Sequence, residues 1–356
     1  VCARCGVETE ESARTQGWSM DSSVSIKDIA RVAGVSPSTV SRALHHHPRI
    51  SEETASRIRR LAEELGYTPS LPARSLVTRT TATIGLVITH PSDPFLGRLV
   101  LGVEDTAQHK GYSVFLSSSY RNAERDQEVI RAFHERRATG VIVAGSQIDN
   151  ECAALHDRFP LPIVLINYPL YPHSVSTDNL AGSRQAVEHL VQLGHRRIAF
   201  VANPRSYLSN LNRLSGYKAT LAEHGIPVDE DLIVEGDGGL TGATKAMESL
   251  LGLQEPPSAV FCFNDMTALG VLHSLRCAGL RIPEDCSLVG FDDLELASYY
   301  CPPLTTVRQH RYQLGQRAML MLLALIEGST EVQAEVLPAE LIVRETSGPA
   351  RSSKGI

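Results

Sequence analysis

The sequence predicts a small all-α helix-turn-helix head followed by an α/β body of two doubly wound lobes, each built on a parallel sheet. Three observations predict this fold class: the length of the chain, short capped helical segments near its N-terminus, and a later alternation of apolar runs with segments of helix length. At 356 residues the chain exceeds one ordinary core and suits a small module followed by a larger two-part body. We therefore expect two or three domains.

The composition is typical of a soluble globular protein, with 42% hydrophobic and 21% charged residues. No apolar run reaches the roughly 18 residues that a membrane-spanning helix needs. The net charge of −6 is unevenly distributed, because residues 25–79 hold nine basic and five acidic side chains, a net charge of +4. Residues 1–24 carry −2 and residues 80–356 carry −8. A basic head on an acidic body suits a head that contacts nucleic-acid phosphates.

The seven cysteines are scattered along the chain, and several lie in apolar runs where a free thiol packs as a small hydrophobe. A reducing cytoplasm is the simplest interpretation. Cys2 and Cys5 form a lone CxxC without a second pair or a histidine at zinc-finger spacing, which favours an inert pair. Residues 1–24 and 348–356 are predicted to be disordered tails. The segment before Met20 is either a native tail or an upstream start included in the chain.

The sequence predicts three short helices within residues 25–67. Ser25 opens a capping box before apolar residues at helical spacing, and Gly34 ends this first helix. Ser36, followed by a proline, caps a second helix only a few residues later. Ser51 caps a third helix with its own apolar stripe. Two short helices joined by a glycine-containing turn and braced by a third form a helix-turn-helix.

The second helix, predicted over 37–44, has two different faces. Val40 and Ala43 fall on a side that can pack, whereas Arg42 falls on a polar side that is free to contact another molecule. A plain helical bundle with a solvated polar face is the alternative interpretation, since surface charge usually serves solubility. The next segment, 68–82, weakens this alternative because it carries a cap, a proline and then an apolar residue among polar ones, as in a hinge helix and linker.

Three runs in this region resemble the DNA-binding head and hinge of the LacI family of regulators: SIKDIARVAGVSPSTVSRAL, ISEETASRIRRLAEELGYTPS, and ARSL before TIGLVI. In that family the second helix lies in the major groove, and a leucine of the hinge helix wedges into the minor groove. The resemblance implies base-facing roles for Pro37, Ser38 and Arg42, positioning or phosphate contacts for Ser36, Thr39 and Arg74, and the wedge for Leu76.

The body, predicted over 83–347, begins with an alternation of apolar runs and helix-length segments that predicts parallel sheets. Two lobes joined by strand crossovers fit this length better than one sheet. The runs are TIGLVI, YSVFLSS, GVIVAG, PIVLIN, RIAFVA, SAVFCF and CSLVGF. The resemblance continues through VSTDNLAGSRQAVEHL, FCFND, GFDD and PPLTTVRQ to about residue 347. It implies a periplasmic-binding-protein-like body with the effector between the lobes, beyond the carboxyl ends of the strands.

The resemblance also implies effector contacts from both lobes. An arginine facing a carboxylate can bind neighbouring hydroxyls, which suits a sugar or a nucleoside. Gly238 stands where members that stack a ring on the effector carry Trp or Phe, so stacking from that side is not expected. The residues implied as effector contacts are Phe95, Asn167, Ser209, Arg213, Asn264, Asp292 and Gln309.

Three hypotheses from different classes follow. The first is a repressor that binds a near-palindromic DNA operator as a homodimer, with tetramers left open, and responds to a small-molecule effector without any cofactor or metal. The second, a solute-binding protein for transport, predicts a signal peptide and no basic head. The third, an α/β enzyme, needs a catalytic constellation that is not legible. His195 is assigned a structural role, and His45, His46 and His47 splay apart too far for a metal site.

Overall fold

The computed structural model describes residues 24–44, 47–67, 81–145, 158–203 and 208–351. The chain divides into two compact units, residues 1–79 and residues 80–356, which we describe separately. Several predicted features lie outside the described residues: the DNA contacts Arg74 and Leu76, most of the hinge, the pair Cys2 and Cys5, and the residues His45 and His46.

The described part of the first unit contains three helices, α1 (Ile26–Ala33), α2 (Pro37–Leu44) and α3 (Glu52–Glu64). Their positions agree with the pattern of caps in the sequence. Ser25 and Asp28 form the predicted capping box at the start of α1, and Gly34 ends that helix in the left-handed conformation, with φ of 69°. Local signals therefore define these helices before any tertiary contact is considered.

The three helices enclose one small core. Ile29 of α1, Val40 and Ala43 of α2, and Ile58 of α3 are buried together. The apolar side of α2 is thus the side that holds the unit together. Its opposite side takes no part in this core.

The first lobe of the second unit is a six-stranded, fully parallel sheet in the order β11-β5-β4-β3-β1-β2. Helices α5 and α12 cover one face and α6 covers the other, so the central strands are buried on both sides. The elements are β1 (Thr83–Ile88), α5 (Pro94–His109), β2 (Ser113–Ser118), α6 (Ala123–Glu135), β3 (Gly140–Ala144), β4 (Ile163–Ile166), β5 (Ser174–Thr177), α12 (Arg311–Ile326) and β11 (Glu335–Leu337).

The second lobe repeats this architecture, with a six-stranded sheet in the order β12-β10-β9-β8-β6-β7 in which only β12 runs antiparallel. Helices α8 and α9 cover one face, and α10 and α11 cover the other. The elements are α8 (Asn179–Gln192), β6 (Ile198–Ala202), α9 (Leu208–Glu223), η1 (Glu230–Leu232), β7 (Ile233–Glu235), α10 (Leu240–Leu251), β8 (Ala259–Cys262), α11 (Asp265–Cys277), β9 (Ser287–Asp292), η2 (Glu295–Ser298), β10 (Thr305–Gln309) and β12 (Ala339–Ile342).

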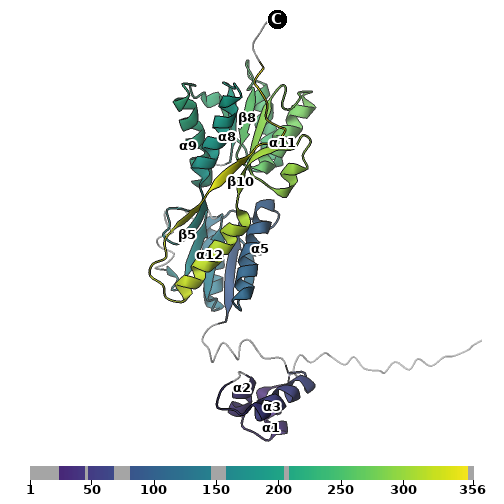
Figure 1. Cartoon of the computed structure of the whole chain (residues 1–356), viewed down its shortest axis with the longest axis vertical. Coiled ribbons are helices and arrows are strands. Elements are labelled where there is room, and N and C mark those ends of the chain that lie inside the picture. The colour runs from purple at the N-terminus through teal and green to yellow at the C-terminus, as the bar shows by residue number, and fades with distance from the viewer. Residues whose placement is uncertain (1–23, 45–46, 68–80, 146–157, 204–207, 352–356) are drawn as a thin grey trace, which may run out of the picture. The chain divides into compact units, whose positions relative to one another are not determined.

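Within the described ranges the chain passes from one sheet to the other three times: after β5, after β10, and between β11 and β12. Helix α12 therefore follows a strand of the second lobe but packs in the first, where it lies against α5 (Figure 1). Two crossings are joined directly, because the Asp178 amide donates to the Leu337 carbonyl at 2.8 Å. The lobes are thus connected by adjacent segments.

The end of the chain differs from the prediction. The sequence predicts a disordered tail from Gly348 onward, but the Gly348 backbone amide donates to Ser287 Oγ at 3.1 Å, and the Ala350 backbone amide donates to the Leu193 carbonyl at 2.8 Å. Buried His195 explains this docking, because its Nε2 lies 3.1 Å from the Gly348 carbonyl and its Nδ1 lies 3.0 Å from Ser258 Oγ. The structural role predicted for this histidine therefore includes fixing the segment that follows the body.

Candidate functional site

The free face of α2 carries the residues that the sequence assigned to DNA bases. Pro37, Ser38 and Arg42 are exposed, and Arg42 makes no side-chain hydrogen bond or ion pair with another described residue. Ser36 has a different local role, since its Oγ accepts a hydrogen bond from the Thr39 amide at 3.1 Å and lies 2.9 Å from Thr39 Oγ1. This N-cap fixes the start of the helix and leaves the arginine available to a ligand.

Polar residues line one edge of the second lobe, at the carboxyl ends of its parallel strands. Gln309 ends β10 and Asp292 ends β9. Asn203 directly follows β6, and Asn264 follows β8 after one residue. Gly238 lies a few residues beyond β7. Since these strands are neighbours in the order β10-β9-β8-β6-β7, the five residues form a row along the edge where ligands of open α/β sheets bind.

A buried chain of hydrogen bonds connects this row to the first lobe. Gln309 Nε2 donates to Asp292 Oδ1 at 2.6 Å, and Gln309 Oε1 accepts from Thr177 Oγ1 at 2.8 Å. Thr177 is the last residue of β5, where the chain crosses between the lobes. A ligand that binds Asp292 would therefore act on groups at the crossing segments.

Arg213 belongs to α9 and is only 2% exposed. Its Nε donates to Asn179 Oδ1 at 2.9 Å, and its Nη1 donates to the Phe263 carbonyl. The guanidinium carbon also lies 4.4 Å from the ring centre of Phe263 and 3.7 Å from that of Phe291. Burial lowers the pKa of Arg213 to about 10, and the charge of Asp292 opposes this change, so the group stays protonated at neutral pH.

Asp292 is 4% exposed, and burial raises the pKa of its carboxyl group to about 7, although the charge of Arg213 acts in the opposite direction. The two side chains form no direct ion pair. Each is held by other groups, and neither Arg213 Nη2 nor Asp292 Oδ2 hydrogen-bonds to a described residue. This arrangement leaves a donor and an acceptor of opposite charge free to bind adjacent polar groups of a ligand.

The other predicted effector residues either make hydrogen bonds within the fold or have no described contact with Arg213. Asn264 Oδ1 caps α11 by accepting from the Thr267 amide at 2.7 Å, and Asn167 Oδ1 accepts from the Thr177 amide at 3.1 Å. The side-chain oxygen of each asparagine is therefore already bonded within the protein. Phe95 is half-buried against the core of the first lobe, and Ser209 is half-buried in the first turn of α9. The described contacts do not join these two side chains to the cluster around Arg213.

Several residues of the site were not predicted. Thr177 and Asn179 orient Gln309 and Arg213, and Asn203 belongs to the polar row. Asp265 is fully buried, where its Oδ1 accepts from Thr306 Oγ1 at 2.5 Å and burial raises its pKa. The sequence contains a signal for Asn203 and Asp265, which follow apolar strand runs directly or within two residues, but not for Thr177 and Asn179, which lie in or after the mostly polar strand β5.

Two arginines bridge the lobes near this edge. Arg121 of the first lobe donates through Nη1 to the Asp237 carbonyl of the second at 3.0 Å. Arg311 donates through Nη2 to the Asp293 carbonyl at 3.0 Å and through Nη1 to the Pro94 carbonyl at 3.4 Å. Both arginines bind backbone carbonyls, so these contacts depend on how the lobes are positioned and not on the pairing of charges.

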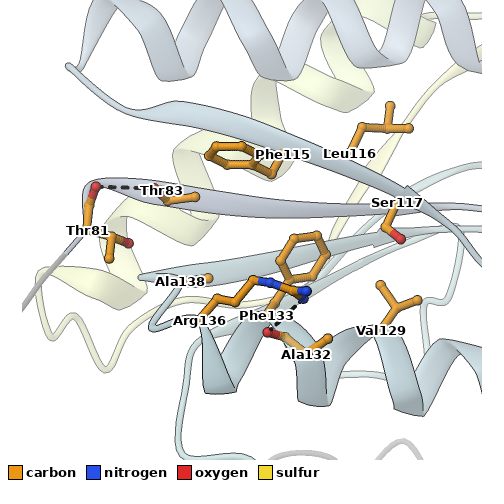
Figure 2. Close-up of a pocket in the computed structure, with 10 residues that line it drawn as sticks. All are labelled: Thr81, Thr83, Phe115, Leu116, Ser117, Val129, Ala132, Phe133, Arg136 and Ala138. Carbon is orange, nitrogen blue, oxygen red and sulfur yellow. Dashed lines mark hydrogen bonds between the residues drawn. The ribbon is translucent and has the colours of Figure 1, made fainter. Parts of the chain in front are cut away.

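A separate hollow lies in the first lobe, between β2 and α6 (Figure 2). Its volume is about 410 Å³, and its lining is mainly apolar, with Phe115 and Phe133 on opposite sides. The charged residue at its rim, Arg136, donates to the carbonyl of Ala132 in its own helix at 3.4 Å. Arg136 is the only charged residue in this lining, and the hydroxyls of Thr81 and Thr83 already donate to backbone carbonyls, so the hollow is a poor match for a polar effector.

Membrane-spanning helices and metal-binding clusters are both absent from the described residues. No helix among them is long and apolar enough to cross a membrane. No group of three or more His, Cys, Asp or Glu side chains among them is arranged to hold a metal ion.

Comparison with known proteins agrees with this architecture. Residues 25–70 match the family described as bacterial regulatory proteins, lacI family, and residues 187–347 match the periplasmic binding protein-like domain. The HTH-type transcriptional repressor PurR of Vibrio atlanticus is 35% identical over 328 residues, which span 90% of this chain and 98% of that protein.

Two solved structures are similar over nearly the whole chain. The Lac repressor dimer bound to operator and an anti-inducer superimposes with a TM-score of 0.85 and 30% identity, covering 92% of this chain and all of that one (100%). A complex of the transcriptional regulator CelR with cellobiose superimposes with a TM-score of 0.71 and 31% identity, covering 91% and 100% of the two chains.

A helix-turn-helix head joined to a two-lobed body with a polar inner edge defines a DNA-binding regulator with a ligand-binding domain. The chain belongs to the LacI family of bacterial regulatory proteins. The predicted family and fold class are therefore confirmed, and the relatives named above are regulators, not enzymes or transport proteins.

Proposed function

We propose that this protein is a transcriptional repressor whose affinity for its operator is controlled by a small molecule bound at the polar row of the second lobe. The observation that carries the proposal is the buried pair Arg213 and Asp292, each held by other residues and each with one polar atom free. Charged groups are rarely buried without direct pairing unless they serve binding or catalysis. Membership of a regulator family favours binding.

The effector is a sugar or a nucleoside, because opposite charges side by side suit adjacent hydroxyls. The solved complex of the relative CelR with cellobiose supports a sugar. The proposed effector contacts remain Phe95, Asn167, Ser209, Arg213, Asn264, Asp292 and Gln309. The proposed DNA contacts remain Ser36, Pro37, Ser38, Thr39, Arg42, Arg74 and Leu76.

The proposed division of labour follows the predicted boundaries. Residues 25–67 read DNA, residues 68–82 form the hinge, and residues 83–347 sense the effector in the cytoplasm. The effector acts by binding one arrangement of the lobes better than another, which shifts the population that can hold the operator. The hydrogen bonds from Asp292 through Gln309 to Thr177 are the most direct connection between the bound molecule and the segments that join the lobes.

The test uses the purified full-length chain. Selection from a random duplex library at moderate ionic strength should enrich one near-palindromic sequence, because each head of a homodimer reads one half-site. A thermal-shift screen of sugars and nucleosides should then find a ligand that raises the melting temperature. That ligand should change operator affinity at least tenfold, by fluorescence anisotropy.

The variants Arg213→Ala and Asp292→Ala should lose the ligand response and keep operator binding. Enrichment of no sequence over random duplex, with and without the ligands, would contradict the proposed function. Loss of operator binding in both variants without ligand would show that this pair maintains the fold instead of sensing the effector.

A further inference from the structure

Asn203 of the polar row and Asn210 of α9 each carry a buried side-chain amide atom that has no partner among the described residues. Asn203, directly after β6, is 4% exposed, and no described residue hydrogen-bonds to its Oδ1. Asn210, in the first turn of α9, is fully buried, and its Nδ2 is likewise without a partner among the described residues. The two are joined by a single bond, in which the backbone N–H of Asn203 donates to Asn210 Oδ1 at 2.9 Å.

Such atoms require an explanation. More than nine-tenths of buried polar groups in folded proteins are hydrogen-bonded, because an unpaired group loses its bonds to water and gains nothing in return. The Asn203 side chain does not cap a helix or a turn within the described residues, unlike that of Asn264, which caps α11. A bound ligand is the simplest source of the missing bond.

The side chain of Asn203 lies directly beside Gly238, in the loop after β7. A Cβ atom added to Gly238 would lie 2.9 Å from Asn203 Oδ1 and 3.1 Å from its Nδ2. Gly238 also has φ of 73°, which side-chain-bearing residues rarely adopt. The Asn203 amide therefore occupies the space beside residue 238, and no aromatic ring could stand at this position without displacing it.

Neighbouring contacts place this amide at the junction of the lobes. Asn264 Nδ2 donates to the Gly238 carbonyl at 3.0 Å, which fixes the loop on one side. Arg121 of the first lobe binds the carbonyl of the adjacent Asp237. The loop beside Asn203 is thus held by the polar row and also contacted from the opposite lobe, as expected for the wall of an effector site.

We propose that Asn203, positioned by Asn210, is a specificity-determining residue that hydrogen-bonds a hydroxyl of a saturated ring of the effector. An amide offers both an acceptor and donors, and a hydroxyl both donates and accepts, so the two groups are matched. A planar base would gain no stacking from a glycine at this position. The ring is either a free sugar or the ribosyl part of a nucleoside, and the inference rests on the proposed function of the site.

The test is a double-mutant cycle on the full-length protein by isothermal titration calorimetry. The probes are D-ribose, D-glucose, D-galactose, cellobiose, adenosine and cytidine, together with the free bases adenine and cytosine. For the probe that binds, each available monodeoxy analogue is measured against the wild type and Asn203→Ala. One analogue should lose tenfold or more in affinity with the wild type and show no further loss with the variant, because both changes remove the same bond.

A second measurement separates this role from a structural one. Asn203→Ala should leave the melting temperature of the ligand-free protein within about 2 °C of the wild type, since its Oδ1 makes no bond in the fold. Asn212→Ala, on the same helix α9 as Asn210 and half-buried, is the matched control and should change neither the affinity nor the specificity. A fall in melting temperature of more than about 5 °C for Asn203→Ala would make the residue structural and overturn the inference.

The remaining outcomes are distinguishable. Equal affinity of the wild type and Asn203→Ala for the bound probe, or a free base that binds as tightly as its nucleoside, would overturn the inference and leave the proposed function standing. Binding of a free sugar would identify the sugar arm, and binding of a nucleoside with loss on ribose deoxygenation would identify the ribosyl arm. Failure of the wild type to bind any probe would count against the proposed function, and the inference would fall with it.

Discussion

The carboxyl group of Asp292 is under opposing influences. Burial favours its protonated form, whereas the nearby guanidinium of Arg213 and the hydrogen bond from Gln309 favour its ionised form. Burial dominates, and the pKa rises from 3.8 to about 7. The charge on which the proposed effector binding depends is therefore only partly formed at neutral pH in the ligand-free protein.

This pKa has a measurable consequence for stability. Because the folded-state pKa is raised, folding is favoured by this group below about pH 4, and that contribution is lost as the pH rises through about 7. The free energy of unfolding should fall over this range by up to about 4 kcal/mol, at about 1.4 kcal/mol per pKa unit. Asp292→Asn, which cannot ionise, should flatten this part of the profile in urea denaturation at pH 5 and pH 8.

Glu248→Gln, at an exposed position of α10, is the control and should leave the pH profile unchanged. An identical slope for the wild type and Asp292→Asn would contradict the assignment. Asp265 has a pKa raised in the same direction, so only the difference between the two proteins isolates Asp292.

Arg42 is the residue that we expect to read a base. Its exposed guanidinium can donate two hydrogen bonds to guanine O6 and N7, worth about 1–3 kcal/mol of discrimination. Arg42→Ala should remove the preference at one operator position and keep the others, as measured by anisotropy on an operator series with single base substitutions. Arg60→Ala, an exposed arginine of α3, should affect all sequences alike. Uniform weakening by Arg42→Ala would identify a phosphate contact instead.

Among single residues, the sequence predicted the charged pair and Gln309, which donates to Asp292, but not Thr177 and Asn179, which orient Gln309 and Arg213. Arg213 and Asp292 were found through family motifs. Thr177, Asn179 and Asn203 are short polar residues at strand ends, where loops usually contain such residues, and their roles depend on strands far apart in the sequence. Only the order of strands in the two sheets brings them to one edge.

The contact between α5 and α12 depends on two glycines. A Cβ atom added to Gly102 of α5 would lie 2.1 Å from the Tyr312 carbonyl oxygen, and one added to Gly315 of α12 would lie 2.0 Å from the Leu99 carbonyl oxygen. Each distance is far shorter than van der Waals contact, and each neighbour is backbone that cannot rotate away. The absence of side chains at these positions lets the two helices approach closely.

Gly102→Ala should therefore destabilise the first lobe, by about 1–3 kcal/mol or more, as insertion of methyl groups into packed interiors does. Gly97→Ala is the matched control, because it lies on the same helix and an added Cβ would meet nothing within 4 Å. That variant should be neutral or more stable by about 0.5–1 kcal/mol. Urea denaturation followed by circular dichroism measures both, and equal stability of the two variants would contradict the close approach.

Elements with strong local signals were predictable and the others were not. The helices of the head begin and end at caps that the sequence contains, such as Ser25 and Gly34. The seven apolar runs correspond to β1, β2, β3, β4, β6, β8 and β9, of which only β2 is an edge strand. Strands β5, β7, β10, β11 and β12 were not among these runs. Strands β7 and β11 have three residues each and are only partly buried, whereas β5 and β10 are buried but consist mostly of polar residues. No local sequence pattern indicates that α12 packs in the first lobe after a strand of the second.

For the whole molecule, the proposed homodimer requires a surface that the single chain leaves uncovered. The edge strand β2 exposes 57% of Phe115 and 47% of Leu116 beside the apolar hollow of the first lobe. Adjacent exposed apolar side chains on an edge strand favour contact with another chain. We expect this edge to be buried in the dimer.

Phe115→Lys should therefore weaken the dimer by at least tenfold in dissociation constant, since it places a charge in an apolar contact. Sedimentation equilibrium on the full-length chain measures this change. Leu170→Lys, at a side chain that is 73% exposed elsewhere on the first lobe, is the control and should leave the dimer intact. A Phe115→Lys protein that remains dimeric with the same affinity would place the interface on another surface.

The return of α12 to the first lobe also orders events on the ribosome. Five of the six strands of that lobe precede Asp178, yet the apolar face that Leu314, Met319 and Leu322 cover stays open until the whole second sheet except its last strand has been translated. At typical elongation rates this interval is on the order of ten seconds. The nascent chain therefore presents a half-covered sheet to chaperones throughout synthesis of the second lobe, and no stop codon before residue 311 can yield a complete first lobe.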